Sequence, residues 1–170
     1  MTENSDVEVR RTARVLLLDS QDRLLLVKFQ DPYVHEPGKA PSGAPFWATV
    51  GGCLEDGEDI IAAARREVRE ETGLVDIQFG PVVWYGEQVL ILKEGERLLK
   101  ESFVVARTRE QEPVATQWTD DERETIVDLR WWRLDALRET DETVYPKVLP
   151  ELLPVILRGD YPDPVLIITL

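Results

Sequence analysis

One segment, residues 51–74, constrains the structure and chemistry of this chain more than any other. It opens on two glycines, and residues 59–72 then contain neither Gly nor Pro, which predicts a helix. Glu67, Glu70 and Glu71 are spaced i, i+3 and i+4, so their side chains share one face of that helix. Each like-charged pair at this spacing destabilises a helix by about 0.2–0.5 kcal/mol. Folding alone therefore gives no reason to place the three glutamates together.

A bound divalent cation would compensate this repulsion. Mg²⁺ prefers oxygen ligands and is usually held by a few carboxylates together with the phosphates of a substrate. The whole chain has 33 Asp and Glu against 20 Lys and Arg, which gives a net charge of −13. So acidic a protein repels nucleic-acid polymers and anionic membranes, and neither is expected as a partner. An anionic small-molecule ligand would need a cation to mediate its binding.

Two further features of the segment fit a ligand site. Gly51 and Gly52 carry no Cβ, so the backbone can approach a ligand closely, and a carbonyl near Gly52 can join a metal shell. Arg66 follows Glu58 by eight residues, about two helical turns, and can hold the loop that precedes the helix. We therefore interpret Arg66 as an orienting residue.

The spacing of these residues resembles the Nudix box at every specified position. Residues 52–74 read Gly52, five residues, Glu58, seven residues, Arg66, Glu67, Val68, one residue, Glu70, Glu71, one residue, Gly73 and Leu74. The resemblance implies an α/β protein with the Nudix fold, an α/β/α sandwich built on a mixed β-sheet. It also implies a pyrophosphohydrolase that uses Mg²⁺ or Mn²⁺ to cleave a pyrophosphate bond in a nucleoside diphosphate linked to another moiety.

The same resemblance assigns roles to individual residues. By this carry-over Glu67, Glu70 and Glu71 bind the metal, together with a carbonyl near Gly52. Glu67 and Glu70 are the catalytic candidates for orienting or deprotonating the attacking water, unless an acid outside the box does so.

Members of the family often recruit a further acidic residue from late in the chain. Here an acidic cluster precedes a predicted strand at residues 125–134, and within it Glu122 and Glu124 are the candidates. The alternative is that this cluster is an ordinary solvated loop.

The rest of the chain predicts strands and helices around the box. Residues 14–18 and 24–29 are expected to form a hairpin, followed by a long proline-rich loop at 31–45. We expect further strands at 46–50, 75–92 and 98–105, a loop at 107–121, and helices at 135–140 and 145–158. These elements add up to a single domain over residues 1–170, with a flexible leader at 1–9 and an apolar tail at 161–170. The tail could cover the core or a second subunit, so a homodimer stays open.

Three single residues complete the expectations. Trp47 leads into the glycine turn and, with Phe29, could line the substrate pocket and stack on a base. The alternative for Trp47 is a place in the hydrophobic core. Cys53 is the one cysteine, so no disulfide can form within the chain, which fits a reducing compartment. No apolar run approaches the length of a membrane span, and the cytoplasm is therefore the expected location.

Two other functions remain open beside the hydrolase. The chain could be a non-catalytic nucleotide-binding or sensor module on the same fold, which an intact box disfavours. It could also be an isomerase of the isopentenyl diphosphate type, which would need catalytic Cys and Glu motifs outside the box, whereas Cys53 lies inside it. No motif in the loops at 31–45 and 107–121 names the substrate.

Overall fold

A computed structural model of the chain describes residues 7–109, 112–114 and 118–170. Within these residues the strands are β1 Glu8–Leu18, β2 Leu24–Phe29, β3 Phe46–Cys53, β4 Ile77–Leu92, β5 Gly95–Thr108, β6 Ile126–Trp132, β7 Val144–Tyr145 and β8 Leu166–Ile167. The helices are α1 Ile60–Thr72, α2 Asp120–Thr125, α3 Leu134–Glu139 and α4 Leu149–Leu157. None of the helices in this described part is long and apolar enough to cross a membrane.

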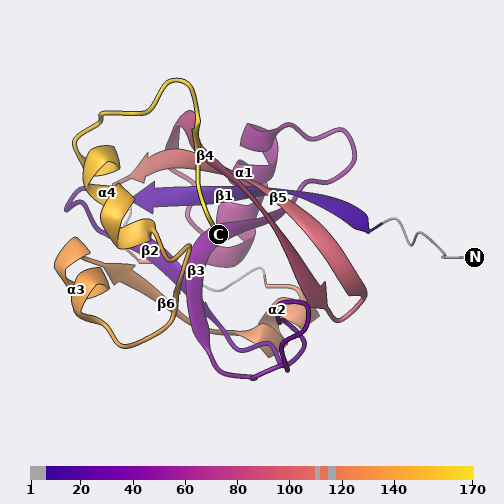
Figure 1. Ribbon diagram of the computed structural model, residues 1–170. Helices are drawn as coiled ribbons and strands as arrows, with labels where there is room; N and C mark the ends of the chain where they lie inside the picture. The colour runs from indigo at the N-terminus through magenta and orange to yellow at the C-terminus, as the bar shows by residue number, and fades with distance from the viewer. Residues whose placement is uncertain (1–6, 110–111, 115–117) are drawn as a thin grey trace, which may run out of the picture.

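The strands form one mixed sheet in the order β6-β2-β3-β1-β5-β4-β8, with β7 paired to β3 (Figure 1). The long central pair, β1 with β5, is parallel, and so are the short pairs β3 with β7 and β4 with β8. The other pairs are antiparallel. The mixed sheet expected from the box is therefore confirmed.

Apolar side chains of the sheet alternate between its two faces, and helices cover both. In β1, Val15 and Leu17 pack with Ala64 and Val68 of α1, whereas Leu16 and Leu18 belong to a second core. That second core contains residues of α3 and α4, and Figure 1 shows α1 and α4 on opposite sides of the sheet. This layering is the predicted α/β/α sandwich.

The helix of the box has clear ends. Asp59 caps it by accepting a hydrogen bond from the Ala62 N–H at 2.8 Å. Gly73 ends it with a left-handed φ of 72°, and a Cβ there would lie 2.6 Å from the Val114 carbonyl oxygen. Inside these ends Ala64 and Val68 are buried as expected.

Several other expectations were wrong in detail. The strands at 14–18 and 24–29 do not form a regular hairpin, because β1 pairs mainly with β3 and β5 and meets β2 only at Leu18 and Leu24. The strand β1 begins at Glu8, inside the expected leader; residues 1–6 lie outside the described part. The helix expected at 145–158 begins at Leu149, because Tyr145 belongs to β7 and the residue before a proline disfavours helical geometry.

The tail at 161–170 packs onto its own chain. Its short strand β8 pairs with β4, and the Ile168 N–H donates to the Tyr85 carbonyl at 2.8 Å. Ile168 is buried in the core, and Leu170 lies so close to Gly86 that a Cβ on that glycine would come within 2.7 Å of it. The tail therefore covers part of the sheet of this chain.

Candidate active site

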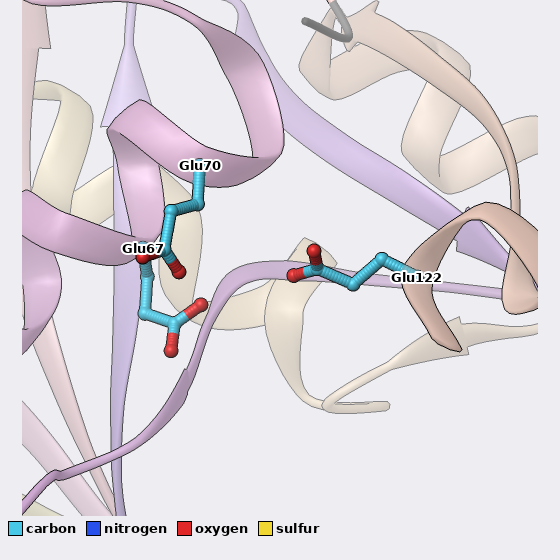
Figure 2. Close-up of side chains that lie close together, drawn as sticks. All are labelled: Glu67, Glu70 and Glu122. Atoms are coloured by element: carbon cyan, nitrogen blue, oxygen red, sulfur yellow. The ribbon is translucent and has the colours of Figure 1, made fainter. Parts of the chain in front are cut away.

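Three carboxylates from two helices meet at one place. Glu67 and Glu70 lie one turn apart on α1, and Glu122 reaches them from α2 (Figure 2). One oxygen atom from each of the three groups lies within 4.8 Å of the other two. The helix face predicted from the acid spacing thus exists, and an acid from outside the box joins it.

A short helix positions Glu122. Thr119 caps α2 with a reciprocal pair of hydrogen bonds: the Thr119 N–H donates to Glu122 Oε2 at 2.6 Å, and the Glu122 N–H donates to Thr119 Oγ1 at 3.3 Å. Glu124, the other candidate, is exposed and does not belong to the carboxylate cluster. Of the two acids proposed from sequence, the structure therefore brings Glu122 to the box and leaves Glu124 in solvent.

Arg66 ties the site together. Its Nε and Nη2 atoms donate to the two oxygens of Glu58 at 2.8 and 2.9 Å, and Nη2 also donates to the Cys53 carbonyl at 2.9 Å. Its Nη1 atom donates to Glu67 Oε1 at 2.7 Å and to Glu70 Oε2 at 3.2 Å. Arg66 thus joins the preceding loop to two of the clustered acids, in the orienting position inferred from its spacing.

Each clustered carboxylate has one anchored oxygen. Arg66 holds Oε1 of Glu67 and Oε2 of Glu70, and the Thr119 amide holds Oε2 of Glu122. For the second oxygen of each group, no hydrogen-bond partner is found within the described residues. Anchoring one oxygen fixes the orientation of a carboxylate while the other stays available to a ligand.

The two glycines before the helix lie against the acids of α1. A Cβ on Gly52 would lie 2.5 Å from Glu67 Oε1, so only glycine leaves that carboxylate where it is. The Gly51 N–H donates to Glu71 Oε2 at 3.1 Å. Glu71 was expected to bind metal with the others, but it is only 3 % exposed and is not part of the cluster. The contact with the Gly51 N–H anchors one oxygen of Glu71, which also lines the cleft beside the glycine turn.

Burial and pairing set the charge states of these groups. Burial raises the pKa of Glu67, partly offset by hydrogen bonding to Arg66. Burial raises the pKa of Glu71 well above its usual range, and the nearby charge of Glu67 adds to the effect. The Arg66 guanidinium lowers the pKa of Glu58 to about 2, so this ion pair is intact at neutral pH.

A cleft of about 550 Å³ adjoins the box at Gly51, Gly52 and Glu71. It runs between the central strands, the proline-rich loop and the segment 143–147. Phe29 and Phe46 line it with their rings stacked and the ring centroids 5.8 Å apart. The ring of Tyr145 stands edge-on to Phe46, with 5.7 Å between the two centroids.

Trp47 does not line this cleft, so of its two expected places the structure supports the core and not the pocket. Its side chain is fully buried and packs edge-on against Trp132 at 5.2 Å. Alternation along β3 turns Trp47 into the core and leaves its neighbour Phe46 at the cleft.

Comparison with known proteins identifies the family. The sequence model described as the NUDIX domain matches residues 8–152, most of the chain. The chain belongs to the Nudix family. This confirms the family predicted from the box and, with it, the enzyme class of Nudix-type pyrophosphohydrolases. A search of curated proteins finds no match.

Solved structures share the Nudix fold at low sequence identity. A UDP-X diphosphatase superposes with a TM-score of 0.61 at 18% identity, covering 95% of this chain and 68% of that one. The E. coli dihydroneopterin triphosphate pyrophosphohydrolase gives 0.59 at 18% identity, with 90% and 99% covered. An ADP-ribose pyrophosphatase from Streptococcus suis gives 0.54 at 16% identity, with 94% and 98% covered. At such identities the likeness establishes the fold alone.

The donor set of this Nudix site fits a hard divalent cation. All three clustered groups are carboxylates, and Gly52 leaves open the space that a Cβ would fill beside them. Oxygen-only sites of this kind suit Mg²⁺ or Mn²⁺, whereas zinc sites usually contain His or Cys. The metal identity expected from the box is therefore chemically consistent with the residues present.

Sequence reasoning overlooked how Glu122 is placed, although a signal existed. Thr119 followed by Glu122 is the spacing of a capping box, which marks the start of a helix. Reading that signal would have favoured Glu122 over Glu124 and replaced the end of the expected loop with a helix.

Proposed function

We propose that this chain is a divalent-metal-dependent hydrolase that cleaves a pyrophosphate bond in a nucleoside diphosphate linked to another moiety. The observation that carries the proposal is the meeting of Glu67, Glu70 and Glu122 next to an open cleft. Stability does not account for three like charges within 4.8 Å of one another, whereas a cation with a pyrophosphate does.

In this proposal Glu67, Glu70 and Glu122 hold Mg²⁺ or Mn²⁺, and a carbonyl near Gly52 completes the protein ligands. A bound cation would polarise a phosphoryl oxygen and offset the negative charge that collects on the breaking bond. Glu71, also expected among the ligands from sequence, stays a proposed ligand: the Gly51 N–H anchors its Oε2, and no hydrogen-bond partner of its other oxygen is found within the described residues.

The residues of the chain orient the reactants and accept a proton. Arg66 fixes Glu67 and Glu70 from one side, so that the unanchored oxygen of one of them can accept the proton of the attacking water. Phe29 and Phe46 line the cleft, and their rings offer apolar surface on which a base can stack.

The identity of the second moiety does not follow from the fold. The three structural neighbours named above carry the names of different substrates while sharing the same architecture with this chain. We therefore limit the proposal to the class of nucleoside diphosphate derivatives and leave the linked group to experiment.

The test is turnover of a panel of such nucleotides with Mg²⁺ or Mn²⁺, with identification of the products. Glu67→Gln and Glu70→Gln should each lower kcat by at least about 100-fold if these groups act on the reacting atoms. Glu122→Gln should weaken metal activation, and Glu124→Gln, its exposed neighbour on the same helix, is the matched control and should behave as wild type. Full activity of both box variants would refute the mechanism.

The same panel addresses the alternative of a non-catalytic sensor. Nucleotide binding without any product after long incubation with metal would favour the sensor and overturn the hydrolase. Release of phosphate-containing products, in place of an isomerised substrate, would exclude the isomerase.

A further inference from the structure

The floor of the cleft contains an ion pair that the proposed mechanism does not use. Arg14 of β1 donates from Nε to Glu101 Oε1 of β5 at 2.7 Å. Thr12 donates to the same oxygen at 3.3 Å, and Gln88 lies 3.4 Å from the other. Glu101 is only 4 % exposed, so a charged group is held inside the sheet where the sheet faces the cleft.

Stability is a weak explanation for this pair. Removing two charges from water costs several kcal/mol, and replacing a buried ion pair with apolar residues of similar volume is often neutral or stabilising. The parallel pairing of β1 with β5 is already fixed over eleven residue pairs, so the ion pair is not needed for register. Since neither stability nor strand register explains the charged guanidinium at this place, binding of an anionic ligand is the remaining explanation.

The guanidinium lies at the end of the cleft nearest the carboxylate cluster. Arg14 Nη1 donates to the Gly51 carbonyl at 3.2 Å. The Gly51 N–H in turn donates to Glu71 Oε2. The next residue, Gly52, lies against the carboxylate of Glu67. For Arg14 Nη2, no hydrogen-bond partner is found within the described residues, so this nitrogen remains available to an anion in the cleft.

Three other cations of the cleft have partners away from the glycine turn, and one of them, Lys147, lies over the Tyr145 ring at 5.8 Å from its centroid. Arg10 lies 3.5 Å from Glu94 at the β4–β5 turn, and Lys39 pairs with Glu36 in the proline-rich loop. Within the described part of the chain, none of these three side chains hydrogen-bonds to Gly51, whereas Arg14 does. Arg14 is thus the cleft cation that the fold ties directly to the glycine turn of the box.

From these contacts we infer that Arg14 binds the diphosphate of the substrate opposite the carboxylate cluster, and that Glu101 is the residue that positions Arg14. The inference rests on the proposed function, since it assigns a binding residue to the same site. Guanidinium groups suit phosphate oxygens, and one that is already fixed loses little conformational entropy on binding. In a protein with a net charge of −13, such a fixed cation also offsets the repulsion of an incoming anion.

The test measures binding without turnover. Methylenediphosphonate, which cannot be hydrolysed at its bridge, is titrated into the full chain with Mg²⁺ by calorimetry. Arg14→Gln should weaken its binding by about 10- to 100-fold, the loss expected for one charge-assisted hydrogen bond. Arg11→Gln removes an exposed arginine from the same strand and should bind as wild type.

A second pair of variants separates binding from folding. Arg14→Lys keeps the charge but loses the fork that bonds Glu101 and Gly51, so its affinity should fall between those of Arg14→Gln and wild type. Glu101→Gln keeps an acceptor for Arg14 and should raise the KM for a turned-over nucleotide more than it lowers kcat. A structural pair would lower the unfolding temperature and leave KM unchanged.

Wild-type affinity of Arg14→Gln for methylenediphosphonate, or no Mg²⁺-dependent binding to the wild type, would overturn the inference. These outcomes are distinct from failure of the proposed function. A protein that turns over no nucleotide but binds the probe through Arg14 retains the inference and loses the hydrolase. A protein that turns over nucleotides with Arg14→Gln unaffected retains the hydrolase alone.

Discussion

Gly52→Ala tests the proposed metal site with the smallest change that the chain allows. A Cβ on Gly52 would lie 2.5 Å from Oε1, 2.7 Å from Cδ and 2.9 Å from Oε2 of Glu67. The backbone of Gly52 is not among those with positive φ, so alanine fits its conformation. The three atoms nearest to the added methyl group therefore all belong to the Glu67 carboxylate.

The size of the effect follows from these distances. Ordinary contact begins at 3.4 Å, so Glu67 Oε1 must retreat by about 0.9 Å. Metal–ligand distances tolerate deviations of only about 0.2 Å, and a misplacement of about 1 Å can lower a rate by about 100-fold. We expect kcat to fall by about 100-fold and the Mg²⁺ concentration for half-maximal activity to rise. The unfolding temperature should change little, because the end of a flexible side chain can move aside.

Two other glycines serve as controls for this prediction. In Gly80→Ala the nearest atom to the new Cβ, the Val105 carbonyl oxygen, lies 3.4 Å away, so activity and stability should both stay at the wild-type level. In Gly51→Ala the new Cβ would lie 2.0 Å from the Ala13 carbonyl oxygen, and rigid backbone cannot yield, so the fold itself should be destabilised. Unchanged kcat and Mg²⁺ activation in folded Gly52→Ala would refute the assignment of Glu67 to the metal.

Three further predictions concern single side chains. In Arg66→Lys the ammonium group cannot reproduce the forked contacts of the guanidinium, so metal affinity should fall by about 10- to 100-fold. A titration of activity against Mg²⁺ measures this change, and wild-type affinity would contradict the orienting role. The pKa of Glu58 is lowered from 4.5 to about 2 on folding, so the stability that this group contributes is present above pH 4.5 and is lost as pH falls toward 2. The unfolding free energies of wild type and Glu58→Gln should therefore converge on acidification. A difference that stays constant with pH would contradict the pairing. Trp47→Ala should lower the free energy of unfolding by about 3–5 kcal/mol, while the milder Trp47→Phe should leave KM unchanged, since the ring lies in the core; a raised KM would place it at the cleft after all.

The helix of the box was predictable from sequence because its determinants are local. Asp59 and Gly73 specify its two ends through contacts within four residues, and the observed helix starts one residue after the predicted start. The i, i+3, i+4 spacing correctly placed Glu67 and Glu70 on one face. It could not show that the Gly51 N–H donates to Glu71, because that contact depends on how β3 packs against the helix.

Strand pairing was less predictable because it is decided at long range. The strands at 14–18 and 24–29 follow one another in the chain and read as a hairpin. In the sheet, however, β1 is bordered by β3 and β5, which leaves β2 to pair with β3 and β6. Alternation alone did not reveal which face of β3 is buried, so both the pocket and the core stayed open for Trp47; the structure places Trp47 in the core and Phe46 at the cleft.

The cation that an acidic protein needs for an anionic ligand illustrates the same division. Composition alone requires positive charge near the site, and the local spacing of the box supplies the carboxylates for a metal. The second cation, Arg14, stands 87 residues from its partner Glu101 in the chain, and only the parallel register of β1 with β5 brings the two together. Its sequence context, three arginines near the start of a strand, is more typical of a solvated surface. Glu67 and Glu70 of the proposed reaction centre can therefore be predicted from one contiguous segment, whereas Glu122 and the surface that receives the substrate depend on contacts between distant parts of the chain.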